Sequence, residues 1–413
     1  MSTNIVIPRE IRTALNILNN NGFEAYIVGG CVRDSLLGNT PKDWDITTSA
    51  RTDKISPCFK EYRTINTGLK HGTVTVIIQG MQIEITTYRI DGSYTDNRHP
   101  DTVFFTDKIA DDLQRRDFTI NAMAYGKNGI VDLFGGISDI ESRIIRCVGE
   151  PDERFGEDGL RILRALRFSS VLGFKIEKNT EESIRKNKEL LCNISKERIV
   201  SEFNKLLMGL DFRNVMTEYR ELVEVFISEI KIFNDKEWEI ILNSMKHADS
   251  LTLRLALLLY ETDSAERILK TLKYDGKTIS SVGLLSSCRD EKLIPDKVAI
   301  KKLLKKIGYD NYTALIKFKA AVFKARGHVF LNELDVVYEA EKAAEEIVAR
   351  NECYSLKILD VDGEDLIGAG ISRGIILGDA LNELLDLVIE GKLENKKEVL
   401  LDYIKNFKLA VDK

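Results

Sequence analysis

The hydrophobic pattern of this chain changes near Pro151, and the change limits what the sequence can fold into. Up to about residue 145, short β-branched or apolar runs alternate with turn-forming residues, which is typical of strands in a sheet. Beyond Pro151, apolar residues recur at helical spacing in stretches such as 251–260 and 380–393. We therefore predict an α+β fold, with a small mixed or antiparallel β-sheet in the head and all-α segments after it.

The same pattern divides the chain into four predicted parts, although no Pro/Gly/Ser-rich linker separates them. They are a sheet-containing head (1–147), a neck (148–210), a helical body (211–345) and a helical tail (346–413).

Composition excludes several classes of protein. With 44% hydrophobic and 30% charged residues and 6 prolines among 413 residues, the chain is neither collagen-like nor mostly disordered. Its longest apolar run, 255–260, is far shorter than the roughly 20 residues of a membrane helix, and its first residues lack a secretion signal. We therefore expect a cytoplasmic protein. The six cysteines lack metal-ligand spacing and are expected to be reduced.

A pair of glycines lies where a strand is expected to meet a helix. The apolar run 25–28 leads into Gly29 and Gly30, and a short helix containing Arg33 follows. Glycines at such a turn let backbone N–H groups approach a phosphate closely, and the N-terminus of a helix favours negative charge. We predict an anion site here, to which Arg33 adds a positive charge.

Two aspartates follow this turn, and a third acidic residue lies in a hairpin. Asp43 and Asp45 are expected on one strand, where residues i and i+2 share a face. Glu84 is expected on the second strand of a hairpin that turns at Gln79 and Gly80. Mg²⁺ is typically bound by one or two carboxylates together with substrate phosphates. We predict that Asp43 and Asp45 hold Mg²⁺ and that all three are catalytic; the alternative is an Asp-rich turn and a solvated glutamate.

The chain resembles a known enzyme family in an ordered series of motifs over about residues 20–210: GGCVRD, DWD, IEITTYR, RRDFTINAM, EDGLRILRALRF and ISKERIVSEF. These resemble the class II tRNA nucleotidyltransferases, the CCA-adding enzymes of the polymerase beta-like superfamily. The tail is similar to that of the Gram-positive-type bacterial members. The resemblance implies template-independent addition of C, C and A to the 3′ end of tRNA from CTP and ATP. It also implies release of pyrophosphate, Mg²⁺ as cofactor and a two-metal in-line transfer.

The resemblance implies nucleotide-binding roles in the head. Gly30 and Arg33 would contact the incoming nucleotide, and Arg116 would bind its triphosphate. Asp117 would accept a hydrogen bond from a ribose hydroxyl, and Asn121 would support the nucleotide. The alternative for Arg116 and Asp117 is an ordinary surface ion pair.

The EDGLRILRALRF motif is predicted to choose the base. Its spacing of three predicts Asp158, Arg161, Arg164 and Arg167 along one side of a helix. Cytosine and adenine each present an exocyclic amine beside a ring-nitrogen acceptor, which an Asp acceptor and an Arg donor match; guanine and uracil present a carbonyl there. We predict that Asp158 and Arg161 form this template, while Arg164 and Arg167 hold phosphates or support the pair. The alternative is a helix with a Glu157–Arg161 ion pair.

A turn-rich segment, 91–106, follows the Glu84 strand. It resembles the flexible loop that the family associates with switching to ATP addition and that CC-only members typically lack. The alternative is an ordinary surface loop. His71 and His99 are isolated histidines, for which we predict no role as metal ligand or general base.

RNA binding is predicted in the helical middle of the chain. The net charge of −5 is unevenly distributed: residues 151–328 carry a net charge of +6, and residues 329–413 carry −9. Eight basic residues stand between 301 and 326, and the first four are predicted to bind phosphates of the tRNA acceptor arm: Lys301, Lys302, Lys305 and Lys306. The alternative is a solvated face.

Other activities stay open at this point. An A-adding enzyme that works with a separate CC-adding partner would share these motifs. A bacterial poly(A) polymerase is expected to carry a GRRF-like signature where this chain reads INTGLKHGTVTV. A non-catalytic tRNA-binding module would not need three intact carboxylates. The resemblance leaves a homodimer open, and no membrane partner is expected.

Overall fold

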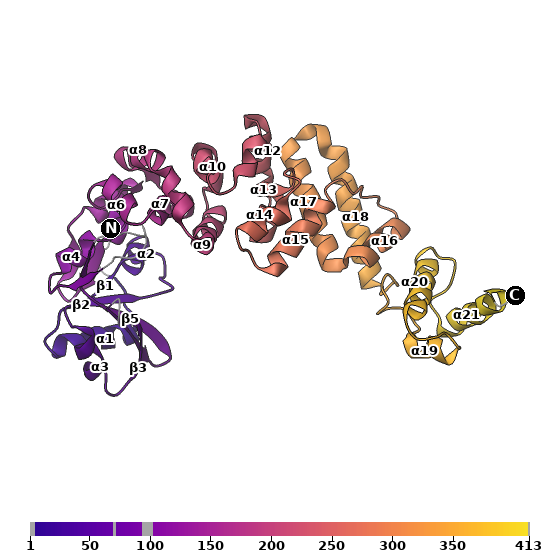
Figure 1. Ribbon diagram of the computed structural model, residues 1–413, viewed down its shortest axis with the longest axis horizontal. Coiled ribbons are helices and arrows are strands. Elements are labelled where there is room, and N and C mark those ends of the chain that lie inside the picture. The colour runs from indigo at the N-terminus through magenta and orange to yellow at the C-terminus, as the bar shows by residue number, and fades with distance from the viewer. Residues whose placement is uncertain (1–4, 69–71, 93–101, 412–413) are drawn as a thin grey trace. The chain divides into compact units, whose positions relative to one another are not determined.

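The computed structural model describes residues 5–68, 72–92 and 102–411, and the chain divides into two compact units, Met1–Ser228 and Glu229–Lys413. Figure 1 shows that the strands belong to the N-terminal part of the chain and that the rest is helical. The predicted α+β fold, with a sheet-containing head followed by helices, is confirmed. The four finer domain boundaries stay predictions.

The head is built on a mixed seven-stranded sheet with the order β3-β4-β5-β2-β1-β8-β9. The β2–β5 pair is parallel, and the other neighbours are antiparallel. The strands are β1 (Ala25–Val28), β2 (Asp45–Thr48), β3 (Arg63–Gly68), β4 (Thr73–Ile78), β5 (Met81–Thr87), β8 (Met123–Gly126) and β9 (Gly129–Asp132). Two short ladders accompany the sheet: β6 (Arg89–Asp91) with β7 (Val103–Phe105), and β10 (Ile144–Ile145) with β11 (Lys175–Ile176).

The predicted hairpin is β4–β5. Its register brings Ile78 opposite Met81, which leaves Gln79 and Gly80 as the turn. Both have positive φ, 50° and 87°, as the two central residues of a type I′ turn require. This turn fixes the register of β5 against β4, in which Glu84 lies opposite Thr75.

The helices of the first unit surround the sheet and continue into the neck. They are α1 (Arg9–Asn20), α2 (Gly30–Leu36), α3 (Thr52–Cys58), α4 (Ile109–Gln114), η2 (Thr119–Asn121), α5 (Gly136–Ser142), α6 (Pro151–Glu157), α7 (Leu160–Leu172), α8 (Lys178–Lys186), η3 (Lys188–Asn193), α9 (Lys196–Leu207), α10 (Phe212–Glu218) and α11 (Arg220–Val223). The pair α7 and α9 packs through buried apolar residues that include Leu166 and Phe203. Gly173 ends α7 in the left-handed conformation, which glycine adopts without steric cost.

The second unit is helical. Its helices are η4 (Ser228–Ile232), α12 (Asp235–Met245), α13 (Leu251–Leu259), α14 (Ala265–Thr271), α15 (Gly276–Ser287), α16 (Lys297–Ile307), α17 (Tyr309–Arg326), η5 (His328–Phe330), α18 (Leu331–Ala349), α19 (Gly363–Gly368), α20 (Ile375–Ile389) and α21 (Lys397–Val411). Ser250, Asp275 and Asp296 cap α13, α15 and α16 by accepting a hydrogen bond from a first-turn N–H. Leu366, Leu384 and other buried residues form a separate apolar core between α19, α20 and α21.

Two expectations about the chain as a whole can be compared with this fold. Within the described ranges, no helix combines the length and apolar character needed to cross a membrane. The six cysteines are free thiols, as predicted.

Candidate functional site

The glycine turn lies between β1 and α2, as predicted. Gly29 has φ +83° and ψ −132°, a backbone conformation that is open mainly to glycine. A Cβ atom at this position would lie 2.9 Å from Nη1 of Arg116. The turn therefore needs glycine for its backbone and also for the arginine that lies over it. This brings Gly29 and Arg116, which are far apart in sequence, into one place.

Arg33 follows this turn in α2 and is buried. Its Nη1 donates a hydrogen bond of 2.6 Å to Oδ1 of Asn121, and its Nε donates one of 2.8 Å to Asp34. The guanidinium also lies 5.0 Å from the centre of the Phe168 ring, which belongs to α7. Arg33 thus joins the glycine turn to a helix of the neck.

Arg116 is held by an acidic residue that had no predicted role. Asp112, in α4, is fully buried and accepts hydrogen bonds from Arg115 (2.8 Å) and Arg116 (3.2 Å). Burial alone would raise the pKa of Asp112. Arg115 and Arg116 outweigh this effect and hold that pKa below its ordinary value. The ion pair of Arg116 is therefore anchored in the protein interior, unlike the exposed pair that was the alternative. The spacing of four residues between Asp112 and Arg116, from α4 to just beyond its end, was the available sequence signal.

The three predicted carboxylates lie around the start of β2, an inner strand of the sheet, and on its neighbour β5. Asp45 is the first residue of β2, and its partner in the parallel register is Glu84 of β5. Asp43, Asp45 and Glu84 are all exposed. Partial desolvation and the charges of Glu84 and Asp43 raise the pKa of Asp45, while Arg116 acts in the opposite direction. Arg116 thus lies close enough to influence both the glycine turn and a candidate metal ligand.

One detail of this prediction is wrong: Asp43 does not belong to the strand. The strand begins at Asp45, because the chain bends at Lys42, next to Pro41, and no ladder pair reaches Asp43. The predicted alternation of side chains between two faces is nevertheless present, since Trp44 is buried while Asp43 and Asp45 are exposed.

The residues present fit a divalent metal that is also bound by its substrate. Among the described residues, no group of three or more His, Cys, Asp or Glu side chains could enclose a metal ion. Neighbouring carboxylates with an open side suit a cation such as Mg²⁺, which keeps positions for water and phosphate oxygens. Desolvation first, and then the charges of Glu84 and Asp43, raise the pKa of Asp45, and a bound cation would offset those two charges.

Asp117 connects the head with the neck. It is buried and accepts hydrogen bonds from the Phe118 N–H (2.8 Å), from Asn121 Nδ2 (3.1 Å) and from Arg164 Nε (2.9 Å) and Nη2 (2.5 Å). Burial acts to raise its pKa, but Arg164 and Asn121 prevail and hold that pKa well below the ordinary aspartate value. A continuous chain of contacts therefore runs from Arg33 through Asn121 and Asp117 to Arg164.

The predicted arrangement of the EDGLRILRALRF motif is partly wrong. Asp158 is not on the helix with the three arginines, because α6 ends at Glu157 and α7 begins at Leu160. Asp158 has the extended conformation φ −142°, ψ 101°, and its Oδ1 accepts a hydrogen bond of 3.0 Å from the N–H of Leu160. Competition of Asp side chains for backbone N–H groups is the usual reason why aspartate stands at the start of a helix.

The two template residues make separate contacts. Oδ2 of Asp158 lies 2.7 Å from Nη2 of Arg198, in α9. Arg161 donates to Glu157 (2.6 Å) and to the carbonyl oxygens of Arg154 (3.2 Å) and Arg115 (3.0 Å). The Glu157–Arg161 pair of the alternative interpretation is therefore present, and it spans the break between two helices.

Arg164 and Arg167 share an acidic partner in α9. Glu202 is buried and lies 3.7 Å from Nη1 of Arg164 and 2.9 Å from Nε of Arg167. Desolvation lowers the pKa of Arg167 to about 10, even though Glu202 opposes this shift. The guanidinium of Arg167 lies 3.9 Å from the centre of the Phe168 ring. Sequence reasoning gave no role to Arg198 or Glu202, although both stand in the ISKERIVSEF motif at a spacing of four.

The four predicted RNA-binding lysines lie in α16 and form ion pairs within the second unit. The pairs are Lys301–Glu352 (2.8 Å), Lys302–Glu390 (2.6 Å), Lys305–Asp386 (2.7 Å) and Lys306–Glu291 (3.7 Å). Three of the four acids belong to the acidic C-terminal segment 329–413. The RNA-binding role of the lysines stays a prediction.

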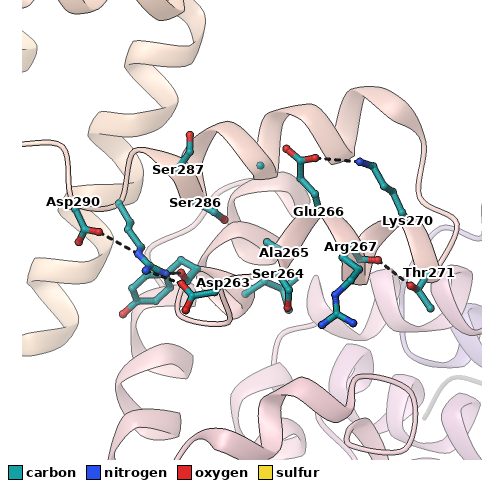
Figure 2. A pocket seen from close by; sticks show the side chains of 14 residues that line it. Asp263, Ser264, Ala265, Glu266, Arg267, Lys270, Thr271, Ser286, Ser287 and Asp290 are labelled. Atoms are coloured by element: carbon teal, nitrogen blue, oxygen red, sulfur yellow. Dashed lines mark hydrogen bonds and ion pairs between the residues drawn. The ribbon is translucent and has the colours of Figure 1, made fainter.

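Two further parts of the chain are the predicted loop of the head and a pocket of the second unit. The central part of the predicted loop 91–106, with His99, and also His71, lie outside the described residues; the flanks of the loop form β6 and β7. Figure 2 shows a pocket of the second unit in which Glu266 pairs with Lys270. The pocket has a volume of about 820 Å³, and Arg289 in its lining pairs with Asp263 (2.7 Å). None of the candidate nucleotide or metal residues lines this pocket.

Comparison with known proteins identifies the family. Residues 25–146 match the model of the poly A polymerase head domain, residues 173–224 that of the RNA and SrmB-binding site of polymerase A, and residues 246–404 that of tRNA nucleotidyltransferase domain 2. The chain is 36% identical to the CCA-adding enzyme of Lactobacillus helveticus over 403 residues, 95% of each chain. It is 35% identical to that of Enterococcus faecalis over 97% of each chain. The chain belongs to the CCA-adding enzymes.

Solved CCA-adding enzymes share its fold. The Bacillus stearothermophilus CCA-adding enzyme, in complex with CTP, is 31% identical with a TM-score of 0.79, over 98% of this chain and 99% of that one. The Thermotoga maritima CCA-adding enzyme complexed with tRNA is 21% identical and has the same fold, with a TM-score of 0.61.

Membership of the CCA-adding enzymes confirms the expected family and its Gram-positive type. The chain is a tRNA nucleotidyltransferase, and this family implies use of a divalent metal. CCA addition is supported, whereas A addition alone and a non-catalytic module are not favoured.

Proposed function

We propose that the chain extends tRNA by C, C and A at the N-terminal end of β2 in the head, with the base chosen by residues of the neck. The observation that carries the proposal is the position of Arg116, which lies over Gly29 and influences the charge of Asp45. A nucleotide whose triphosphate lies at the glycine turn would have its α-phosphate beside the carboxylates.

In this proposal Asp43 and Asp45 hold Mg²⁺, and Glu84 adds negative charge beside them. The bound metal would activate the tRNA 3′-hydroxyl and neutralise charge on the phosphates. Gly29 and Gly30 leave room for the phosphates at the start of α2, and Arg33 and Arg116 supply positive charge. Pyrophosphate leaves in line with the attacking hydroxyl.

The nucleotide would be oriented by the contact chain from Arg33 to Arg164. We assign Asn121 to supporting the nucleotide and Asp117 to accepting a hydrogen bond from a ribose hydroxyl. Because Asp117 is kept ionised by Arg164, it stays an acceptor at neutral pH. Arg164 and Arg167 would balance the buried acids and support the selecting residues.

Asp158 and Arg161 keep enough unused hydrogen-bonding capacity to read a base. A guanidinium has five N–H donors, and three contacts of Arg161 are known, so donors remain for a ring nitrogen. Each oxygen of Asp158 makes one contact and can accept another from an exocyclic amine. Guanine or uracil would leave these groups unpaired, which can reject a wrong base by a factor on the order of 10⁴.

The tRNA would be bound in part by Lys301, Lys302, Lys305 and Lys306. We propose the cytoplasm as the location of the reaction, since its substrates are tRNA and free nucleotides.

A homodimer stays a prediction, and light scattering of the purified protein would test it.

The experiment that tests the proposal offers labelled CTP and labelled ATP separately to two substrates: tRNA that ends at the discriminator base and tRNA that ends in CC. We expect CTP incorporation only into the first and ATP incorporation only into the second. Failure to incorporate CTP into the first substrate contradicts the proposal and leaves A addition alone. Chelation of divalent metal should stop both reactions, and Mg²⁺ should restore them.

A further inference from the structure

Arg198 makes a specific contact with the proposed base-selecting residue Asp158. It lies in the first turn of α9, forty residues away in sequence, and its Nη2 donates a hydrogen bond of 2.7 Å to Asp158 Oδ2. The two side chains are only 23% and 17% exposed, so the pair is largely shielded from solvent. A shielded, charge-assisted hydrogen bond is stronger and more directional than one on the surface.

Asp158 depends on this contact for its orientation. The residue has an extended conformation between α6 and α7, and its other oxygen accepts a hydrogen bond of 3.0 Å from the N–H of Leu160. Together, Leu160 and Arg198 hold one oxygen each and so fix the plane of the carboxylate. Without Arg198 the carboxylate could turn about its side-chain bonds, and the lone pairs left for a base would have no constant direction.

The contacts of Arg198 are directed at the EDGLRILRALRF motif. Its Nη2 contacts Asp158, and its Nη1 is buried without a hydrogen-bond partner among the residues that the structure describes. One turn further along α9, Glu202 contacts Arg164 and Arg167. Helix α9 therefore supports the EDGLRILRALRF motif from one face, at a spacing of four residues.

We propose that Arg198 is a specificity-positioning residue, which acts through Asp158 to set how strongly the enzyme prefers C and A over U and G. The inference rests on the proposed role of Asp158 in base selection. Arg198 itself is not required to touch the nucleotide.

The test measures kcat/KM for CTP and for UTP with tRNA that ends at the discriminator base, and takes their ratio as the discrimination. The variants are Arg198→Met, Arg198→Lys, Asp158→Ala and the double variant Arg198→Met/Asp158→Ala. Arg198→Met removes the charge and the donors at similar length, while Arg198→Lys keeps the charge without the planar fork. The control is Arg185→Met, which removes another neck arginine, one that pairs with Glu181 at 2.8 Å and also with Glu221.

We expect Arg198→Met to lower the discrimination about tenfold, the usual effect of losing a hydrogen bond to a charged group. Arg198→Lys should recover part of it, and tRNA affinity should not change. In the Asp158→Ala background, Arg198→Met should have no further effect, because the positioned group is absent. Arg185→Met should leave the ratio unchanged, which separates loss of positioning from general loosening of the neck.

Two results would overturn the inference in different ways. Arg198 does not act through Asp158 if Asp158→Ala loses discrimination while Arg198→Met and Arg198→Lys keep it. The same conclusion follows if the losses of discrimination in Arg198→Met and Asp158→Ala multiply in the double variant. If Asp158→Ala keeps full discrimination, base selection at Asp158 is wrong and the inference falls with it. If Arg198→Met does not fold, the test rests on Arg198→Lys. A folded Arg198→Lys whose ratio of kcat/KM for CTP and UTP equals that of the wild type would contradict the inference.

Discussion

The side chain of Arg116 lies over Gly29, where Nη1 would be 2.9 Å from a Cβ atom at that glycine. A heavy atom so close to a Cβ is not tolerated, so any larger residue at position 29 would displace the arginine. The buried carboxylate of Asp112 holds the arginine from its other side. The anion site thus depends on a residue without a side chain, a buried acid and the arginine between them.

Replacement of Gly29 by alanine should therefore impair nucleotide binding more than stability. We expect Gly29→Ala to raise the KM for CTP and ATP at least about tenfold, because a displaced Arg116 loses its contact with the triphosphate. The backbone conformation of Gly29, φ +83° and ψ −132°, should cost an alanine about 1–3 kcal/mol of stability in addition. Steady-state kinetics and thermal unfolding measure the two effects.

Gly22→Ala is the matched control. Gly22 has the same φ of +83°, but nothing lies within 4 Å of a Cβ atom there. It should lose stability without any change in KM. Equal KM values for the two variants would show that Arg116 has no part in binding the triphosphate.

The Asp117–Arg164 pair should make stability depend on pH in the acid range. The pKa of Asp117 is lowered on folding, so its contribution is fully present above the ordinary pKa of about 3.9 and is lost progressively below it. We expect Asp117→Asn to lower the free energy of unfolding at pH 7 by about 3 kcal/mol, because Arg164 loses its main buried partner. The difference from the wild type should shrink as the pH falls below 4.

Asp152→Asn is the control for this prediction. Hydrogen bonds from Lys186 and Ser183 lower the pKa of Asp152 to about 2, but its pair with Lys186 is exposed. Exposed pairs contribute little, so Asp152→Asn should leave the stability nearly unchanged. Urea unfolding between pH 2.5 and 7 compares the variants, and a wild-type-like profile for Asp117→Asn would contradict the interpretation.

The sequence predicted local features well where one signal decided the structure. The β4–β5 turn at Gln79-Gly80 and the glycine turn after β1 were confirmed, because turn chemistry leaves few alternatives. The position of Asp158 was wrong, since a continuous helical spacing does not reveal that Asp158 and Gly159 separate α6 from α7.

The contacts between distant residues could not be predicted. Arg198 and Glu202 were visible as charged residues of a helix, but their partners lie in other elements, and only the packing of α7 on α9 joins them. Likewise, the lysines of α16 were correctly noticed as a basic cluster, while their acidic partners stand up to 88 residues away in the sequence. Tertiary packing rather than local pattern decides such pairs.

The four lysines of α16 should differ in their effect on tRNA binding. The side chain of Lys306 is 65% exposed, and its ion pair with Glu291 is long, at 3.7 Å. The side chain of Lys301 is 14% exposed, and its ion pair with Glu352 is shorter, at 2.8 Å. We expect Lys306→Ala to weaken tRNA binding and to reduce the salt slope by about one, as for the loss of one phosphate contact. Lys301→Ala should mainly lower stability. If charge reversal at Lys302 and Lys306 together leaves tRNA affinity and its salt dependence unchanged, the RNA is bound elsewhere.

The central claim is that the carboxylates at the start of β2 carry out the nucleotide transfer. It is tested most directly by single-turnover incorporation of labelled CTP by Asp43→Ala and Asp45→Ala, together with the tRNA dissociation constant of each variant. We expect incorporation to fall on the order of 10³-fold or more, because charge stabilisation of the transferring phosphate is lost, while tRNA affinity stays the same. Normal incorporation by both variants would contradict the account.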